Sequence, residues 1–197
     1  MQGKLIAIEG CDGSGLSTQT SLLCEWLRNA GYGVHQTKEP TENFIGKTIR
    51  SILRGEIVSG QKTLQLLFCA DRAHHIESEI IPALKQGKVV VTDRYIMSTL
   101  AFGSLDEDVG WLKNLNEKFP RPDLTIFIDV PETVSINRIK SSRPGTELFE
   151  KTGKLKKIRE NYKKLAKVFP NTITVDGTQS VEKVFETVKA SVKELLT

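Results

Sequence analysis

The sequence has few cysteines, no long apolar run and no large excess of charge of either sign. Its three cysteines are an odd number without the spacing of metal ligands, so we expect reduced thiols and no disulfide framework. No segment approaches about 18 continuous apolar residues, which argues against a membrane-spanning helix. The first residues lead directly into a strand-like segment without a signal peptide. Together these absences predict a cytoplasmic protein with no membrane partner.

The charge balance is mildly basic. Lysine and arginine number 28, aspartate and glutamate 24, and the formal net charge is only +4. A DNA-binding protein would be expected to carry a clustered basic stripe, so we expect no nucleic-acid partner. The mild basicity suits ligands with several phosphates, although a generally basic surface would give the same number.

Strand-like and helix-like segments alternate along the chain, with no repeat and no low-complexity stretch. Apolar runs predict five strands, at residues 5–8, 34–37, 88–93, 124–130 and 172–176. The alternation predicts an α/β fold, with a parallel sheet covered by helices on both faces, in a single domain of residues 1–197. Polar side chains follow four of the strands, at Glu9, Glu39, Asp93 and Asp129. Ligands of such sheets bind at the carboxyl ends of the strands, so we expect a site there.

Helical spacing of apolar residues is clearest in three segments. It predicts helices at residues 44–54 and 64–85, and a last helix that begins after Ser180 as its N-cap. The segment 64–85 is apolar on more than one face, and Pro82 should bend it. Burial against the core on one side and a second copy of the chain on the other would satisfy that pattern, although a wholly interior helix would too.

A glycine-rich segment follows the first strand and opens a helix. It reads Gly10-Cys11-Asp12-Gly13-Ser14-Gly15-Leu16-Ser17, followed by Thr18. It matches the phosphate-loop pattern G-x-x-x-x-G-K-[ST] at every defined position except the lysine, where Leu16 stands. Backbone N–H groups of such a loop point at phosphate oxygens, and the Ser17 hydroxyl would bind Mg²⁺. Without the lysine, either another cation reaches the site or the protein is a poor catalyst.

Several further segments follow in a fixed order. They are Lys38-Glu39-Pro40, Gly46-Lys47-Thr48-Ile49-Arg50, Leu67-Phe68-Cys69-Ala70-Asp71-Arg72-Ala73, Asp93-Arg94-Tyr95-Ile96-Met97-Ser98, Leu100-Ala101-Phe102, Pro122-Asp123-Leu124, Glu147-Leu148-Phe149-Glu150 and Ile158-Arg159-Glu160-Asn161-Tyr162. With the phosphate loop, these segments resemble the thymidylate kinase family over nearly the whole chain. The resemblance implies a three-layer phosphate-loop kinase fold with a five-stranded parallel sheet and a short mobile lid. It also implies transfer of a phosphoryl group from MgATP to dTMP, and a homodimer formed through the helix at 64–85.

The resemblance assigns roles to individual residues of this sequence. Phosphoryl transfer depends on positioning and charge neutralisation, so Arg94, which would grip the acceptor phosphate, is the main catalytic candidate. Asp93 and Ser17 would hold Mg²⁺. The implied contacts with dTMP are Arg72 with a thymine carbonyl, Phe68 with the ring, Ser98 and Thr99 with the base edge, Lys38 and Arg50 with the phosphate beside Pro40, Asp12 with the 3′-hydroxyl, and Phe102 with the 2′ position.

Residues from about 138 to 153 correspond to the mobile lid of related kinases. Positions 11–14 of the phosphate loop contain no basic residue, so we expect the lid to supply the missing cation. Arg143 is the first candidate for the residue that faces the triphosphate, and Arg138 is the second. A solvated basic loop is the alternative interpretation.

The chain departs from the family pattern at two further places. Thr41-Glu42-Asn43 stands where relatives usually have Gly-Gly-Thr, and Phe102-Gly103 stands where they often have Tyr-Gln. Two other functions remain open, a deoxynucleoside kinase and a nucleotide-binding relative with little or no turnover. Basic residues around the acceptor argue against the first of these, because a nucleoside brings no charge that they would neutralise.

Overall fold

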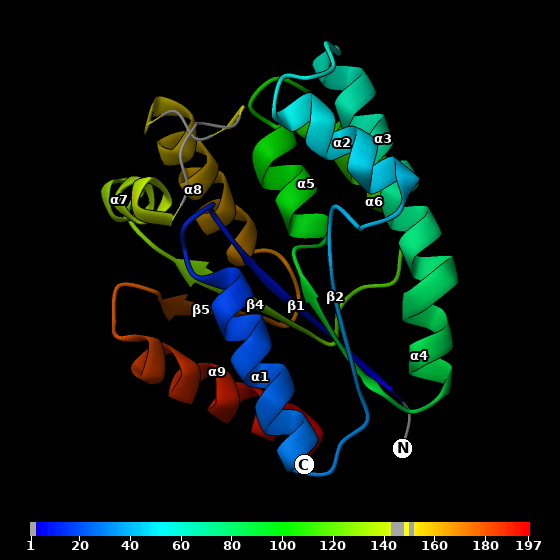
Figure 1. The fold of residues 1–197 in the computed structure, drawn as a ribbon, viewed down its shortest axis with the longest axis vertical. Helices are drawn as coiled ribbons and strands as arrows, with labels where there is room; N and C mark the ends of the chain where they lie inside the picture. The colour runs from blue at the N-terminus through cyan, green and yellow to red at the C-terminus, as the bar shows by residue number, and fades with distance from the viewer. Residues whose placement is uncertain (1–2, 143–147, 150–151) are drawn as a thin grey trace.

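The centre of the molecule is a five-stranded, all-parallel sheet in the order β2-β3-β1-β4-β5 (Figure 1). The structure is a computed structural model that describes residues 3–142, 148–149 and 152–197. The strands are β1 (Lys4–Gly10), β2 (Val34–Lys38), β3 (Val89–Asp93), β4 (Leu124–Asp129) and β5 (Thr172–Asp176). The predicted parallel sheet is thus confirmed, with strand bounds within two residues of those expected.

Helices cover both faces of this sheet. They are α1 (Leu16–Asn29), α2 (Phe44–Leu53), α3 (Gln61–His75), the π-helical turn η1 (Ile76–Ile80), α4 (Ile81–Lys85), α5 (Ile96–Gly103), α6 (Val109–Asn116), α7 (Glu132–Ser142), α8 (Thr152–Ala166) and α9 (Val181–Leu196). In Figure 1, α1 and α9 lie together on one side of the strands, and α5 and α8 on the other. None of the described helices is both long and apolar enough to span a membrane.

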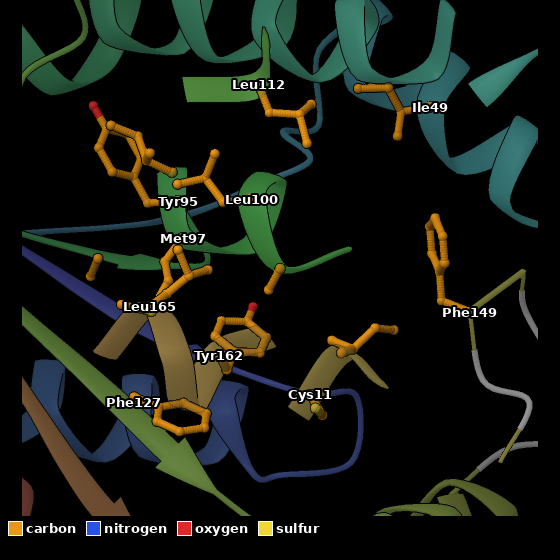
Figure 2. Packing of buried hydrophobic residues seen from close by; sticks show 14 of the residues in the cluster. Cys11, Ile49, Tyr95, Met97, Leu100, Leu112, Phe127, Phe149, Tyr162 and Leu165 are labelled. Atoms are coloured by element: carbon orange, nitrogen blue, oxygen red, sulfur yellow. The ribbon is translucent and has the colours of Figure 1, made fainter. Parts of the chain in front are cut away.

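The central strand β1 contributes to two separate cores. Leu5 and Ala7 belong to a cluster shared with α3, α5 and α8, of which Figure 2 gives a close view. Ile6 and Ile8 belong to a second cluster shared with α1 and α9. Successive side chains of a strand point to opposite faces of the sheet, so a strand covered on both sides must be apolar throughout. This explains the continuous apolar runs from which the strands were predicted.

The long helix predicted at 64–85 is interrupted. Its first part is α3, and the five-residue π-helical turn η1 separates it from α4. Pro82 lies in the first turn of α4, where the missing N–H group of a proline is tolerated. The last helix agrees with its prediction: the Ser180 side chain accepts a hydrogen bond from the Lys183 N–H, and Val184 is buried with the other apolar residues of the stripe.

Candidate active site

The phosphate loop connects β1 to α1 in the predicted way. Gly13 and Gly15 have φ angles of 74° and 99°, in the left-handed region that glycine favours. The Ser14 N–H donates to the Cys11 carbonyl at 3.1 Å and closes the turn. A Cβ atom at Gly13 would lie 2.6 Å from the Ser135 carbonyl oxygen, so the loop also needs glycine there for space. The result is a compact turn of backbone N–H groups at a helix N-terminus, which is a favourable place for phosphate.

Leu16, at the position of the expected lysine, packs into the protein core. Its side chain is 6% exposed and belongs to the apolar cluster between the sheet, α1 and α9. Cys11 in the same loop is also buried, and burial raises the pKa of its thiol to about 12. Neither residue therefore brings a charge to the loop at neutral pH, and the cations must come from other elements.

Besides Arg94, two arginines of α7 and α8 lie close to the phosphate loop. Arg138 of α7 has Nη1 3.5 Å from the Gly13 carbonyl oxygen, and its Nη2 donates to Gly177 at 3.0 Å. Arg159 of α8 donates through Nε and Nη2 to the two carboxylate oxygens of Asp129, at 2.6 and 3.1 Å. Arg138 was the second lid candidate, and the first, Arg143, lies outside the described residues. The sequence did not single out Arg159, which stands in a lysine-rich helix.

Arg94 lies between the phosphate loop and the acceptor side. Its Nη1 donates to the Gly10 carbonyl at 2.7 Å, and its Nη2 donates to the Asp12 carboxylate at 2.6 Å. Burial would lower the pKa of the Arg94 guanidinium, but Asp12 and the other acidic groups around it together raise the pKa. Arg94 has a φ angle of 71°, which is uncommon outside glycine and sets the direction of its side chain.

Glu9 at the end of β1 holds the turn that presents Arg94. Its carboxylate Oε1 accepts the backbone N–H groups of Tyr95 and Ser98 at 3.0 and 3.1 Å. Its Oε2 accepts the Tyr162 hydroxyl of α8 at 3.1 Å. Burial raises the pKa of the Glu9 carboxyl, while the Ser98 hydroxyl and Arg94 act to lower it. Glu9 therefore ties β1, the turn after β3 and the helix after the lid segment into one unit.

Ser17 and Asp93 lie side by side at the ends of the phosphate loop and β3. The Ser17 hydroxyl donates to Asp93 Oδ2 at 2.6 Å. The described residues contain no group of three or more acidic, histidine or cysteine side chains that could cage a metal ion. Mg²⁺ commonly binds through one or two protein oxygens and completes its octahedron with water and phosphate oxygens, so this pair fits Mg²⁺.

A cavity opens between the end of β2, α3 and α5. Its lining contains Asp12, Glu39, Pro40, Leu53, Gln65, Phe68, Arg72, Arg94, Tyr95, Ser98, Thr99, Phe102 and Phe149. Eight of the residues predicted to bind the acceptor are in this lining. The two exceptions are Lys38 and Arg50, and Lys38 faces a neighbouring polar pocket together with Ser17 and Asp93.

Arg72 is buried at the base end of the cavity. It is 1% exposed and donates through Nε and Nη2 to Glu39 Oε2, at 3.0 and 2.6 Å. Its Nη1 donates to Thr99 Oγ1 at 3.0 Å and to Asn116 Oδ1. His75 Nδ1 lies 3.1 Å from the second oxygen of Glu39. Burial would lower the pKa of Arg72, but the Glu39 carboxylate raises it overall, so the guanidinium stays charged.

Lys38 and Arg50, the predicted phosphate ligands, share one counter-ion. The Glu42 carboxylate lies 2.7 Å from Lys38 Nζ with one oxygen and 2.7 Å from Arg50 Nη2 with the other. Arg50 also donates to the Pro40 carbonyl at 2.9 Å, which fixes the guanidinium near the β2 loop. Glu42 thus lies between the two cations that were predicted to bind a phosphate.

The sequence matches a known protein family over most of its length. The family model described as thymidylate kinase matches residues 8–188 of the 197. The chain belongs to the thymidylate kinase family. A probable thymidylate kinase of Pyrococcus horikoshii is 44% identical over all of this chain and 98% of its own length. Thymidylate kinases of Thermosipho africanus and Pelobacter propionicus are 36% and 40% identical, over 97% and 96% of this chain and 98% and 94% of their own lengths.

Sequence reasoning left two kinds of site residue without a role. The rule for strand ends placed Glu9 and Glu39 near the site but did not say what either side chain does. Gln65 and Asn116 stand in helices without any pattern that marks them, and Tyr162 stands in a segment that resembles the family but was given no role. These three enter the site through packing between helices that are distant in the sequence.

Proposed function

We propose that the chain transfers the terminal phosphoryl group of ATP to dTMP in the presence of Mg²⁺, giving dTDP and ADP. Membership in the thymidylate kinase family supports this activity. The structural observation that carries it is the position of Arg94. One guanidinium contacts the Gly10 carbonyl of the phosphate loop and also lines the acceptor cavity, as the transfer of a group between two sites requires.

At the base end, Phe68 would stack on the thymine ring and Arg72 would donate to a thymine carbonyl. A guanidinium has five N–H donors, and the bonds to Glu39, Thr99 and Asn116 use four of them. The fifth is left for the base. A cytosine amino group in the same place would meet another donor, so the arrangement favours a carbonyl.

At the donor end, the phosphate loop would bind the triphosphate through its N–H groups, with Ser17 and Thr18 opening the helix beside it. Arg138, Arg143 of the lid and Arg159 are the cations that could replace the absent lysine. Ser17 and Asp93 would hold Mg²⁺, which would neutralise charge on the phosphate oxygens. Arg94 would then stabilise the charge that moves between donor and acceptor, with Lys38 and Arg50 on the acceptor phosphate.

A homodimer through α3 and a cytoplasmic location remain predictions. Phe44 of α2 and Leu66 of α3 are 71% and 46% exposed, and these two helices pack together. An apolar surface of this kind supports association with a second copy of the chain. Analytical ultracentrifugation of the wild type would test it, and a monomer at micromolar concentration would contradict it.

Two measurements test the proposed activity against its rivals. ADP release is followed with dTMP, dUMP, dCMP, dGMP, AMP and thymidine as acceptors, and binding of ATP and dTMP is followed by calorimetry. We expect turnover to be fastest with dTMP. Turnover with thymidine would identify a nucleoside kinase, and binding of both ligands without ADP release would identify a non-catalytic relative.

A further inference from the structure

Gln65 of α3 lies in the wall of the acceptor cavity. It precedes Phe68 by about one helical turn and Arg72 by two, a spacing that places the three side chains on one face of the helix. All three line the cavity, and Gln65 is 1% exposed. The face of α3 that presents the proposed stacking ring and the proposed carbonyl donor therefore also presents a buried amide.

The amide oxygen of Gln65 is buried without a hydrogen-bond donor in the described part of the chain. Its Oε1 atom is buried and accepts no hydrogen bond from any residue that the structure describes. The neighbouring polar groups are engaged with one another, since Arg72 donates to both Thr99 and Asn116. A buried polar atom without a partner costs about 1–3 kcal/mol, so such atoms in native proteins call for an explanation.

The backbone opposite Gln65 leaves room for this amide. A Cβ atom at Gly103 of α5 would lie 2.8 Å from Gln65 Oε1 and would collide with it. Glycine at position 103 therefore allows the amide to lie between α3 and α5 at the cavity wall. Packing holds the amide at the cavity wall, and no hydrogen bond from the described residues competes for its oxygen.

We propose that Gln65 is a specificity-determining residue that reads the imide edge of the base. Its Oε1 accepts the N3–H of thymine, and its Nε2–H donates to the carbonyl beside N3 that Arg72 does not take. An amide offers an acceptor and a donor side by side, which is the complement of an N–H next to a carbonyl. The inference rests on the proposed function, because it needs the thymine ring to lie over Phe68.

The decisive variant is Gln65→Leu, which keeps the approximate volume and removes the amide. Removal of an unpaired buried polar atom should leave the melting temperature of the free protein equal to or above that of the wild type. The same change should raise the KM for dTMP about 10- to 100-fold and leave the KM for ATP within about twofold. A merely structural role would lower the melting temperature and would not separate the two KM values. Gln65→Met provides the same test should Gln65→Leu fail to fold.

Gln19 of α1 is the matched control. It is also a buried glutamine whose Oε1 has no partner among the described residues, but it does not line the acceptor cavity. Gln19→Leu should leave the KM for dTMP unchanged. A rise equal to that of Gln65→Leu would show that any buried glutamine gives the effect and would overturn the proposal.

N3-methyl-dTMP, which lacks the N3–H, completes the experiment. Wild-type protein should prefer dTMP over this analogue by about tenfold or more, and Gln65→Leu should lose most of that preference. An unchanged KM for dTMP in Gln65→Leu, as expected if Oε1 only holds a water molecule, overturns the inference while the kinase activity stands. A wild type that releases no ADP with dTMP overturns the proposed function instead, so the two failures are distinguishable.

Discussion

The two ends of the acceptor site hold their charges in different ways. At the base end, Arg72 and Glu39 are 1% and 6% exposed, and further buried hydrogen bonds surround their ion pair. At the phosphate end, the side chains of Lys38 and Glu42 are 55% and 65% exposed and form an ion pair open to solvent. The buried ion pair is fixed when the chain folds. In the exposed ion pair, a ligand can take the place of one partner.

This difference decides what a mutation can change. Removing one partner of a buried ion pair costs about 3–5 kcal/mol, because the other charge is left buried without compensation. An exposed pair contributes about 0–1 kcal/mol. Changes at the base end should therefore alter stability and dTMP binding together. Changes at the phosphate end should alter kinetics and leave the fold intact.

The largest expected effect is that of Arg94→Ala, at the junction of the phosphate loop and the acceptor cavity. Loss of a group that stabilises transition-state charge should lower kcat by about 10²- to 10⁴-fold, measured as ADP release at saturating dTMP and ATP. Circular dichroism should show a folded protein, because the side chain lies in a cleft at the end of a strand. Arg54→Ala, which removes an exposed arginine paired with Glu56, is the control and should keep normal turnover. Near-normal turnover of Arg94→Ala would remove the main catalytic assignment.

The next largest effect concerns the missing lysine. Arg138→Ala, and by the same argument Arg143→Ala, should cost about 3–4 kcal/mol of transition-state stabilisation if lid cations replace that lysine. Leu16→Lys should soften this defect, and a double-mutant cycle of kcat/KM values would show the coupling. Because the Leu16 side chain is buried in an apolar cluster, Leu16→Lys alone should lower stability and give at most a modest gain in turnover. Simple additivity would mean that the lid does not compensate.

Arg72→Ala should weaken both the stability of the fold and the binding of dTMP at the base end. We expect the free energy of unfolding to fall by about 3 kcal/mol or more, since Glu39 loses its partner, and the KM for dTMP to rise about 100-fold with little change for ATP. Denaturant melts and substrate titrations measure the two effects separately. Arg72→Lys is the matched variant, because it keeps the charge but loses the planar fork, and it should recover stability more than binding. Equal shifts of both KM values would place Arg72 on the fold or on the donor side.

The difference between buried and exposed parts also bears on which features could be predicted from sequence. The strands were predictable because burial on both faces demands continuous apolar runs, and Glu9, Glu39 and Asp93 followed from the rule that ligands bind at strand ends. The eight-residue helices α5 and α6 are too short for a periodic signal, and α5 is apolar nearly all round.

The buried parts of the site escaped prediction for a related reason. Tyr162 reaches Glu9 across 153 positions of the chain, and Asn116 reaches Arg72 across 44. Such contacts depend on how helices pack on the sheet, and neither the family-like segment that contains Tyr162 nor any local pattern at Asn116 predicts them. The cations Lys38 and Arg50 were found more easily, because they stand in segments that resemble the family.

The smallest expected effect belongs to Glu42→Gln at the phosphate end. In the structure the Glu42 carboxylate bridges Lys38 and Arg50, and the hydrogen bond from Lys38 keeps its pKa below the usual range, so it stays ionised near neutral pH. If Lys38 and Arg50 bind the acceptor phosphate as proposed, the phosphate has to displace this carboxylate or bind beside it, and either costs affinity.

Glu42→Gln removes the competing charge, keeps the side-chain shape, and should lower the KM for dTMP about two- to fivefold, on the scale of exposed ion pairs. The gain should shrink as salt is raised to about 1 M, where exposed charges are screened. Glu56→Gln is the matched control, since Glu56 is also an exposed glutamate paired with an arginine but does not line the polar pocket that Glu42 lines with Lys38. A higher KM for dTMP in Glu42→Gln would mean that Glu42 positions the two cations, and the phosphate end would then be as preassembled as the base end.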